Sequence, residues 1–246
     1  IINDLSMFKY PEFLGKNYTS NFPKLTRIAC EKAFKVVSIS ENTKEELIET
    51  LEVPKAKIEV IYPGLSTFTP GEKLPLGLKS KSYILNVGTV EPRKNLSALL
   101  EGYALLPNHL QEKYPLVIVG ASGWKEGPIY DKWRDLNLQN KVVFAGFLSD
   151  EELASLYKNA SCFIYPSLYE GFGLPVLEAL SFGVPVITSK ISSLPEVGGK
   201  AAIYINPNNP EEIKEQIKKV LLNKKYAEKY QKLGPIQAKK FTWEKS

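Results

Sequence analysis

Short, continuous runs of apolar residues recur between residues 83 and 206, and a segment of helix length follows each one. The runs are YILNVG (83–88), LVIVG (116–120), VVFAG (142–146), CFIYPS (162–167), VPVITS (184–189) and AAIYIN (201–206). They are rich in β-branched residues and do not alternate with polar ones, which is typical of strands buried on both faces of a parallel sheet. Helical patterns lie near 95–106, 125–137, 150–159, 175–182 and 210–223, with a last one near 225–240. The pattern predicts a doubly wound, Rossmann-like α/β domain.

Capping residues mark the ends of some of these helices. Asp150, followed by two glutamates, is expected to be a helix N-cap. Pro175 suits the first position of a helix, and Gly183 suits a helix end.

The first 68 residues form a different piece. IINDLSMF and KVVSIS are expected to be strands, TKEELIETL a helix, and KIEVIYPGLSTF a strand that runs into a crossing loop. Two strands and a helix or two cannot close a core alone, and the chain starts inside what looks like a strand. We therefore expect a fragment that lacks its N-terminal part.

The segment 67–82, rich in Pro, Gly and Lys, is the expected linker. The predicted division is an incomplete first domain at 1–68, a ligand-binding domain at 69–224 and a C-terminal helix at 225–246.

Composition narrows the class of protein. Of 246 residues, 43% are hydrophobic and 24% charged, which indicates a soluble globular protein, and the apolar runs are too short to cross a bilayer. The net charge of +5 comes from scattered lysines without an aromatic-basic platform, so no nucleic-acid partner is expected. Cys162 is expected to be a buried free thiol in a reducing cytoplasm, and His109 to lie in a polar connector without a zinc site.

Four of the loops that follow predicted strands carry polar or glycine-rich sequences. They read GTVEPRKN, GASGW, GFLSDEE and LYEGFGLPVLE, and the first places Arg93 and Lys94 beside the strand end. Ligands of parallel α/β sheets bind beyond the carboxyl ends of the strands. Any one of these loops could be an ordinary connection, but all four on one edge favour a binding site.

The fourth loop leads into a helix and contains two glutamates. Glu170 is expected in the loop, Glu178 in the first turn of the helix, and Gly171 and Gly173 let a ligand approach the backbone. The N–H groups at a helix start bind phosphate, and Lys94, expected to be exposed in the empty site, could supply a countercharge. The alternative is that Glu178 is merely an acid that interacts favourably with the helix dipole, and that Glu170 is a solvated loop acid.

Together, VGTVEPRKN, VIVGASGW, VVFAGFLSDEEL and EGFGLPVLEALSFGVPV resemble the donor domain of retaining glycosyltransferases of family 4, the group that includes sucrose synthase and bacterial mannosyltransferases. NDLSMFKYPEF and SISENTKEEL resemble parts of that family's acceptor domain, and FTWEKS its last helix, which crosses back. The resemblance covers nearly the whole chain. It implies a GT-B architecture, in which two Rossmann-like domains face a cleft.

The resemblance also implies roles for individual residues. Glu178 would hold the ribose of a nucleotide, Glu170 would contact hydroxyls of the donor sugar, and Lys94 would face the diphosphate. The implied catalytic residues are Glu170, Lys94 and Arg93, and the implied donor-binding residues are Gly88, Thr89, Phe147, Leu148, Gly171, Phe172, Gly173, Leu174 and Glu178. The backbone near Gly173 and Leu174 would cap the phosphate, and the loop at Phe147 and Leu148 would flank the base.

Two positions depart from the family's pattern. Many relatives carry Arg five residues before the Lys, where this chain has Thr89, which leaves Arg93 to substitute. Where relatives have His before Asp-Leu-Ser, this chain has Asn3.

The implied reaction transfers a sugar from GDP-mannose or a UDP-sugar to a hydroxyl of a glycan or glycolipid, with retention of anomeric configuration. The protein would be cytoplasmic, with peripheral contact to the inner membrane surface. No Asp-x-Asp motif is present, so neither a metal nor another cofactor is expected, and Lys94, Arg93 and the helix start at Gly173 would neutralise the leaving group.

Two alternatives belong to other classes. A non-catalytic subunit that binds nucleotide sugars is one, given Asn3. A dinucleotide-dependent oxidoreductase is the other, although GFGLPV lacks the third glycine of its motif.

Overall fold

The computed structural model describes residues 1–66 and 69–246, without the side chains of residues 16–18. Its centre is a parallel sheet of six strands in the order β5-β4-β3-β6-β7-β8. The strands are β3 (Ile84–Val87), β4 (Leu116–Val119), β5 (Val142–Gly146), β6 (Cys162–Tyr165), β7 (Val186–Ser189) and β8 (Ala202–Ile205). All six predicted strands are confirmed. The order reverses between β3 and β6, which makes their carboxyl ends the switch point where such sheets bind ligands.

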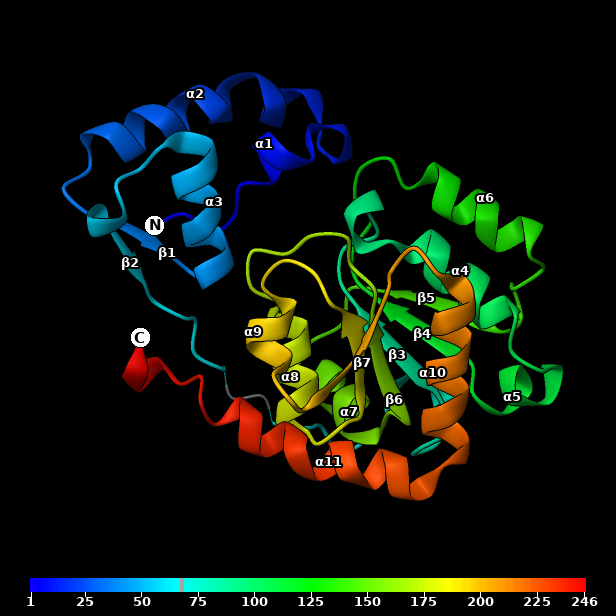
Figure 1. Cartoon of the computed structure of the whole chain (residues 1–246). Coiled ribbons are helices and arrows are strands. Elements are labelled where there is room, and N and C mark those ends of the chain that lie inside the picture. The colour runs from blue at the N-terminus through cyan, green and yellow to red at the C-terminus, as the bar shows by residue number, and fades with distance from the viewer. Residues whose placement is uncertain (67–68) are drawn as a thin grey trace.

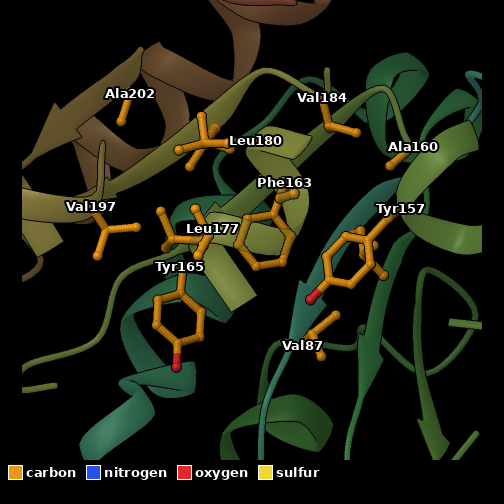
Figure 2. Packing of buried hydrophobic residues seen from close by; sticks show 14 of the residues in the cluster. Val87, Tyr157, Ala160, Phe163, Tyr165, Leu177, Leu180, Val184, Val197 and Ala202 are labelled. Atoms are coloured by element: carbon orange, nitrogen blue, oxygen red, sulfur yellow. The ribbon is translucent and has the colours of Figure 1, made fainter. Parts of the chain in front are cut away.

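Successive residues of each strand point to opposite faces of the sheet. Both faces are therefore apolar, and helices cover each of them. Those on one side are α7 (Asp150–Asn159), α8 (Leu174–Ser181), α9 (Leu194–Gly198) and α11 (Lys224–Ala238), and those on the other are α4 (Leu96–Ala104), α5 (Asn108–Lys113), α6 (Gly127–Asp135) and α10 (Pro210–Leu222). In β6, Phe163 and Tyr165 join the first layer, while Cys162 and Ile164 join the second. Figure 2 shows the first layer, where the rings of Tyr157, Phe163 and Tyr165 pack among aliphatic side chains. Cys162 is a fully buried free thiol, as predicted.

Four details of the helices around the sheet differ from the prediction. Residues 108–113 form α5, so His109 lies in a helix and not in a connector, and α9 was not predicted. Ser149, not Asp150, is the N-cap of α7, since its hydroxyl accepts from the Glu152 N–H while the Glu152 side chain accepts from the Ser149 N–H. Pro175 is the second residue of α8 and not the first.

The N-terminal part forms a smaller unit beside the sheet (Figure 1), with α1 (Ser6–Lys9), η1 (Pro11–Phe13), α2 (Lys16–Lys32), β1 (Val36–Ser38), α3 (Glu41–Leu51), η2 (Lys55–Lys57) and β2 (Ile58–Val60). β1 and β2 are parallel, and Leu5, Cys30, Val36, Leu47, Val53 and Ile58 form a small buried cluster. The 17-residue helix α2 was not predicted.

The predicted strand at the start of the chain is wrong for most of its length. Only Ile2 forms a bridge, to Ser38, and the chain turns into a helix at Ser6. The reason is local, because one carboxylate oxygen of Asp4 accepts from both the N–H (2.9 Å) and the hydroxyl (2.6 Å) of Ser6. Asp side chains that bond the backbone two residues on favour turns over strands.

The predicted linker at 67–82 is partly packed against the sheet unit. Residues 67 and 68, where the crossing loop was also expected, lie outside the described residues. Beyond them, Pro75–Gly77 form η3, Leu74 and Leu78 pack against the core, and the Gly71 N–H donates to the Glu151 carbonyl.

The C-terminal helix α11 lies along α8 (Figure 1). After it, the chain ends in η5 (Trp243–Lys245) and reaches the segment that leaves the small unit. The Leu65 N–H donates to the Phe241 carbonyl, and the Ser246 hydroxyl donates to the Tyr62 carbonyl. Within the described residues, no helix has the length and apolar character needed to span a membrane.

The carboxylate of Glu196 is one of the groups that join the two units. Glu196, on α9, accepts from the N–H groups of Glu41 and Asn42 at the start of α3, both at 2.8 Å, and from the Tyr62 hydroxyl at 3.0 Å. A carboxylate at a helix N-terminus satisfies N–H groups that have no partner within the helix and interacts favourably with the helix dipole.

We predict that Glu196→Ala loosens the docking of the small unit and lowers the free energy of unfolding by about 1–2 kcal/mol. Glu211→Ala, at an exposed ion pair on α10, is the matched control and should change stability little. Thermal or urea unfolding of both variants checks this. Equal stabilities for the two variants would contradict the docking role of Glu196.

Candidate active site

A cavity of about 670 Å³ lies at the switch point of the sheet, between the two units. The loops after β3 and β6 form one wall, and the small unit supplies Asn3, Asp4 and Tyr62 to the other. Of the twelve site residues predicted from the sequence, nine line this cavity, namely Gly88, Thr89, Arg93, Lys94, Glu170, Gly171, Phe172, Gly173 and Leu174.

Three predicted site residues do not line it. Phe147 is 84% exposed after β5, and Leu148 packs partly against the core. Glu178 is the fifth residue of α8, so its predicted place in the first turn is wrong, since the helix begins at Leu174. Its carboxylate accepts from the Tyr157 hydroxyl at 2.8 Å, and burial raises its pKa although this bond acts to lower it.

The carboxylate of Glu170 is the centre of the cavity's charged residues. One oxygen accepts from Lys94 Nζ at 2.7 Å and from the Tyr165 hydroxyl at 2.7 Å, and the other accepts from Arg93 Nη1 at 2.9 Å. Glu170 is only 6% exposed and Lys94 only 8%. The structure therefore contradicts the alternative that Glu170 is a solvated loop acid, and the expectation that Lys94 is exposed in the empty site is wrong.

Arg93 has partners of its own besides Glu170. Its Nη2 donates to Glu91 at 2.7 Å, and its Nη1 also donates to the Tyr169 carbonyl at 3.0 Å. Arg93 and Lys94 lie in the single turn η4 (Pro92–Lys94), and Glu91 is 1% exposed. Glu91 and Tyr165 were not singled out from the sequence, although Glu91 stands within the EPRKN motif and Tyr165 lies within a predicted strand and ends β6.

These contacts fix the charges of the site. Burial would raise the pKa of Glu170, but the charges of Lys94 and Arg93 outweigh it and hold this pKa at about 2. Burial and the neighbouring Glu170 raise the pKa of Tyr165 well above its ordinary value. At neutral pH the site thus contains a carboxylate, two cations and a neutral phenol that can donate a hydrogen bond.

The loop that carries Glu170 is held from both sides. The Glu170 N–H donates to the Ser192 hydroxyl, and the Ser193 hydroxyl donates to the carbonyls of Glu170 and Phe172. From the small unit, Glu46 accepts from the Tyr169 hydroxyl at 2.5 Å. The two serines were missed because they lie more than twenty residues further along the chain.

Gly171 and Gly173 are required for different reasons. A Cβ at Gly171 would lie 2.1 Å from the carbonyl oxygen of Asn3, so the two units can approach only because no side chain is present. Gly173 is the N-cap of α8 and has φ +112°, a backbone conformation that favours glycine. At the start of α8, Pro175 has no N–H and the Val176 N–H donates to the Gly173 carbonyl, so this helix start can offer an anion the Leu174 N–H and the positive end of the helix dipole.

Within residues 1–66 and 69–246 we found no group of three or more His, Cys, Asp or Glu side chains arranged to hold a metal ion. The positive groups at this cavity are Arg93, Lys94 and the start of α8. Together they suit a ligand that carries a phosphate or diphosphate group.

We predict that the contribution of Glu170 to stability is lost in acid. Because its pKa is lowered from an ordinary 4.5 to about 2, the ionised carboxylate stabilises the folded state above pH 4.5 and loses this effect as the pH falls towards 2. The difference in free energy of unfolding between wild type and Glu170→Gln should be constant from about pH 7 to 5 and shrink below that range. A difference that stays constant down to pH 3 would contradict the ion pairs, and Glu215→Gln on the exposed face of α10 is the control.

Comparison with known proteins places the chain in a family. A family model described as "Glycosyl transferases group 1" matches residues 73–237. The O-antigen chain mannosyltransferase B of Escherichia coli is 35% identical over 250 residues, which cover 98% of this chain and 66% of that protein.

Solved structures agree on the fold. The sucrose-phosphate synthase of Thermosynechococcus elongatus superposes with a TM-score of 0.82 at 25% identity, over 98% of this chain and 63% of the synthase. HepE of Anabaena, solved with UDP and glucose, superposes with a TM-score of 0.79 at 20% identity, over 94% of this chain and 65% of HepE. The chain thus spans less than two thirds of each of these three proteins. From the family match and the sheet with its switch-point cavity, we conclude that this chain belongs to the glycosyl transferases group 1 and has the α/β fold of GT-B glycosyltransferases.

Proposed function

We propose that the protein is a retaining, metal-independent hexosyltransferase, which transfers a sugar from a nucleotide diphosphate sugar to a hydroxyl of a glycan or glycolipid. The observation that carries the proposal is the pairing of Arg93 and Lys94 with Glu170 at the switch-point cavity. A mannosyl donor is favoured, since the relative from Escherichia coli is named a mannosyltransferase. HepE, which was solved with UDP and glucose, keeps a UDP-sugar open as the donor.

In this proposal the unit that contains the six-stranded sheet binds the donor in the cavity at the switch point. The hard step is departure of the nucleoside diphosphate, whose charge grows as the bond to the sugar breaks. Arg93, Lys94 and the start of α8, with the Leu174 N–H and the helix dipole, would stabilise that charge without a metal. Glu170 would accept hydrogen bonds from hydroxyls of the donor sugar, and Glu178 would hold the ribose.

The small unit would supply the acceptor side. A second cavity of about 560 Å³ adjoins the first and shares Asn3, Asp4 and Arg93 with it. An acceptor bound there would have its hydroxyl beside the donor cavity, as transfer requires.

A cytoplasmic location at the inner membrane surface suits a glycolipid acceptor. On α2, the apolar side chains of Leu25 and Ile28 are exposed, and Lys24 and Arg27 stand next to them in the sequence. Apolar and basic side chains together favour peripheral contact with an anionic membrane.

Binding of nucleoside diphosphates tests the proposal. We expect calorimetric titration of this chain with GDP, UDP and ADP to show binding of at least one of them, with the same affinity in EDTA. Binding that EDTA abolishes would refute metal independence, and no binding of any of the three would refute the donor site.

The alternative of a non-catalytic nucleotide-sugar-binding subunit rests on Asn3, which lines both cavities where relatives carry His. Release of GDP from GDP-mannose, or of UDP from UDP-glucose, by the full-length protein only when a mannoside acceptor is added would favour the enzyme. Donor binding by the full-length protein without such release would favour the subunit.

We further predict that Glu178→Ala weakens binding of the nucleoside diphosphate by roughly 1.5–3 kcal/mol, the typical worth of a hydrogen bond to a charged group. Tyr157→Phe is the control, because it removes the hydroxyl that bonds Glu178 without removing the carboxylate. Calorimetry compares the two variants. If Glu178→Ala binds as tightly as wild type, the carboxylate only serves to satisfy Tyr157.

A further inference from the structure

The side chains that line the donor cavity carry no excess positive charge. Two are cations, Arg93 and Lys94, and two are carboxylates, Asp4 and Glu170. Both cations already donate to Glu170, at 2.9 and 2.7 Å. A diphosphate that enters this cavity therefore has to compete with the Glu170 carboxylate for the same two cations.

Each cation also has a partner that does not depend on Glu170. Lys94 Nζ donates to the Tyr165 hydroxyl at 2.7 Å, and Arg93 Nη2 donates to Glu91 at 2.7 Å. Tyr165 and Glu91 are each 1% exposed, and Tyr165 is fixed by its ring within the core layer. Removal of the Glu170 carboxylate would thus leave both cations in place, each held on one side.

The backbone of Glu170 is held by groups that do not contact its carboxylate. The hydroxyls of Ser192 and Ser193 hold the N–H and the carbonyl of Glu170. The bonds that have to exchange are those of the carboxylate, to Lys94, Arg93 and Tyr165, and the nearby Ser167 hydroxyl loses its interaction with it.

We propose that the Glu170 carboxylate occupies the place of the donor's diphosphate in the empty site. Donor binding then replaces this carboxylate with the diphosphate as the partner of Lys94 and Arg93. During the exchange Tyr165 acts as a positioning residue for Lys94, and Glu91 as one for Arg93. This inference rests on the proposed function. The exchange forms and breaks no covalent bond: Arg93 keeps Glu91 and Lys94 keeps the neutral Tyr165 hydroxyl, while the diphosphate replaces the Glu170 carboxylate. The exchange also frees the Glu170 carboxylate to accept hydrogen bonds from hydroxyls of the donor sugar. These hydrogen bonds offset part of the free energy that is lost when the carboxylate leaves the two cations.

Glu170→Gln tests the exchange, because the amide competes for the two cations far more weakly than the carboxylate does. We expect the variant to bind GDP, or UDP if wild type prefers it, at least about tenfold more tightly than wild type, as loss of a charged competitor implies. The affinity for inorganic pyrophosphate, which has no sugar or base, should increase to a similar extent. If Glu170 served only to contact the sugar, neither affinity would change.

Asp4→Asn is the matched control. It removes one negative charge from the same cavity wall, but Asp4 accepts from Ser6 and from neither cation among the hydrogen bonds of the described residues. Its effect on GDP and pyrophosphate should be less than about threefold, since it acts only through the general field of the cavity. An equal gain in both variants would overturn the exchange in favour of that field.

The failure of the exchange and the failure of the proposed function give different results. If wild type binds a nucleoside diphosphate and folded Glu170→Gln binds it no more tightly, the exchange is overturned and the donor site stands. If wild type binds none, the donor site is refuted, and the exchange is then judged by pyrophosphate alone, for which no gain overturns it.

Tyr165→Phe provides a second variant should Glu170→Gln not fold. It removes the hydroxyl that would hold Lys94 after the exchange, and it should weaken binding of GDP or pyrophosphate by roughly tenfold. Thermal unfolding separates this from a structural effect, because a merely structural hydroxyl would change the melting temperature and leave the affinity of the folded protein intact. That last result would overturn the positioning role.

Discussion

The buried carboxylate of Glu170 is the constraint on which the site depends. A carboxylate that loses contact with water is costly unless charges and hydrogen bonds replace it. Lys94, Arg93 and Tyr165 provide these replacements, and they come from the loop after β3 and from the end of β6. The need to satisfy one anion therefore holds the two loops of the switch point against each other. A buried cluster of charges need not increase the free energy of unfolding. Its effect here is to fix the positions of the Glu170, Lys94 and Arg93 side chains relative to one another.

Contacts of the same loop determine how the two units meet. Gly171 lets the Asn3 carbonyl lie against the backbone, and Tyr169 donates to Glu46 of α3. Glu196 then satisfies the first N–H groups of α3. The wall of the cavity that would face an acceptor is thus attached directly to the loop that carries Glu170. A movement of the small unit would therefore move the loop that carries the Glu170 carboxylate.

The two positions at which the sequence departs from the pattern that its resemblance implies, Thr89 and Asn3, both line this cavity. Arg93, which was expected to substitute for an arginine at position 89, lines it too and is held by Glu91 and Glu170. Membership of the glycosyl transferases group 1 leaves no support for a dinucleotide-dependent oxidoreductase, which was one alternative from the sequence.

The sequence by itself determined the six strands, the order in which helices follow them and nine residues of the cavity. Continuous β-branched runs separated by helical segments are typical of strands buried on both faces of a parallel sheet, and the carboxyl ends of parallel strands meet at one edge. Only the tertiary structure decided that Lys94 is buried, that Glu91 and Tyr165 hold the cations and that Glu178 lies in the second turn of α8 beside Tyr157. Local patterns also failed at Ser6, where a helix begins beside the Asp4–Ser6 hydrogen bonds in place of the expected strand. Periodicity reports which face of an element is apolar, whereas the protonation and partners of a buried ion depend on groups that are up to about 80 residues away in the chain, as from Arg93 to Glu170.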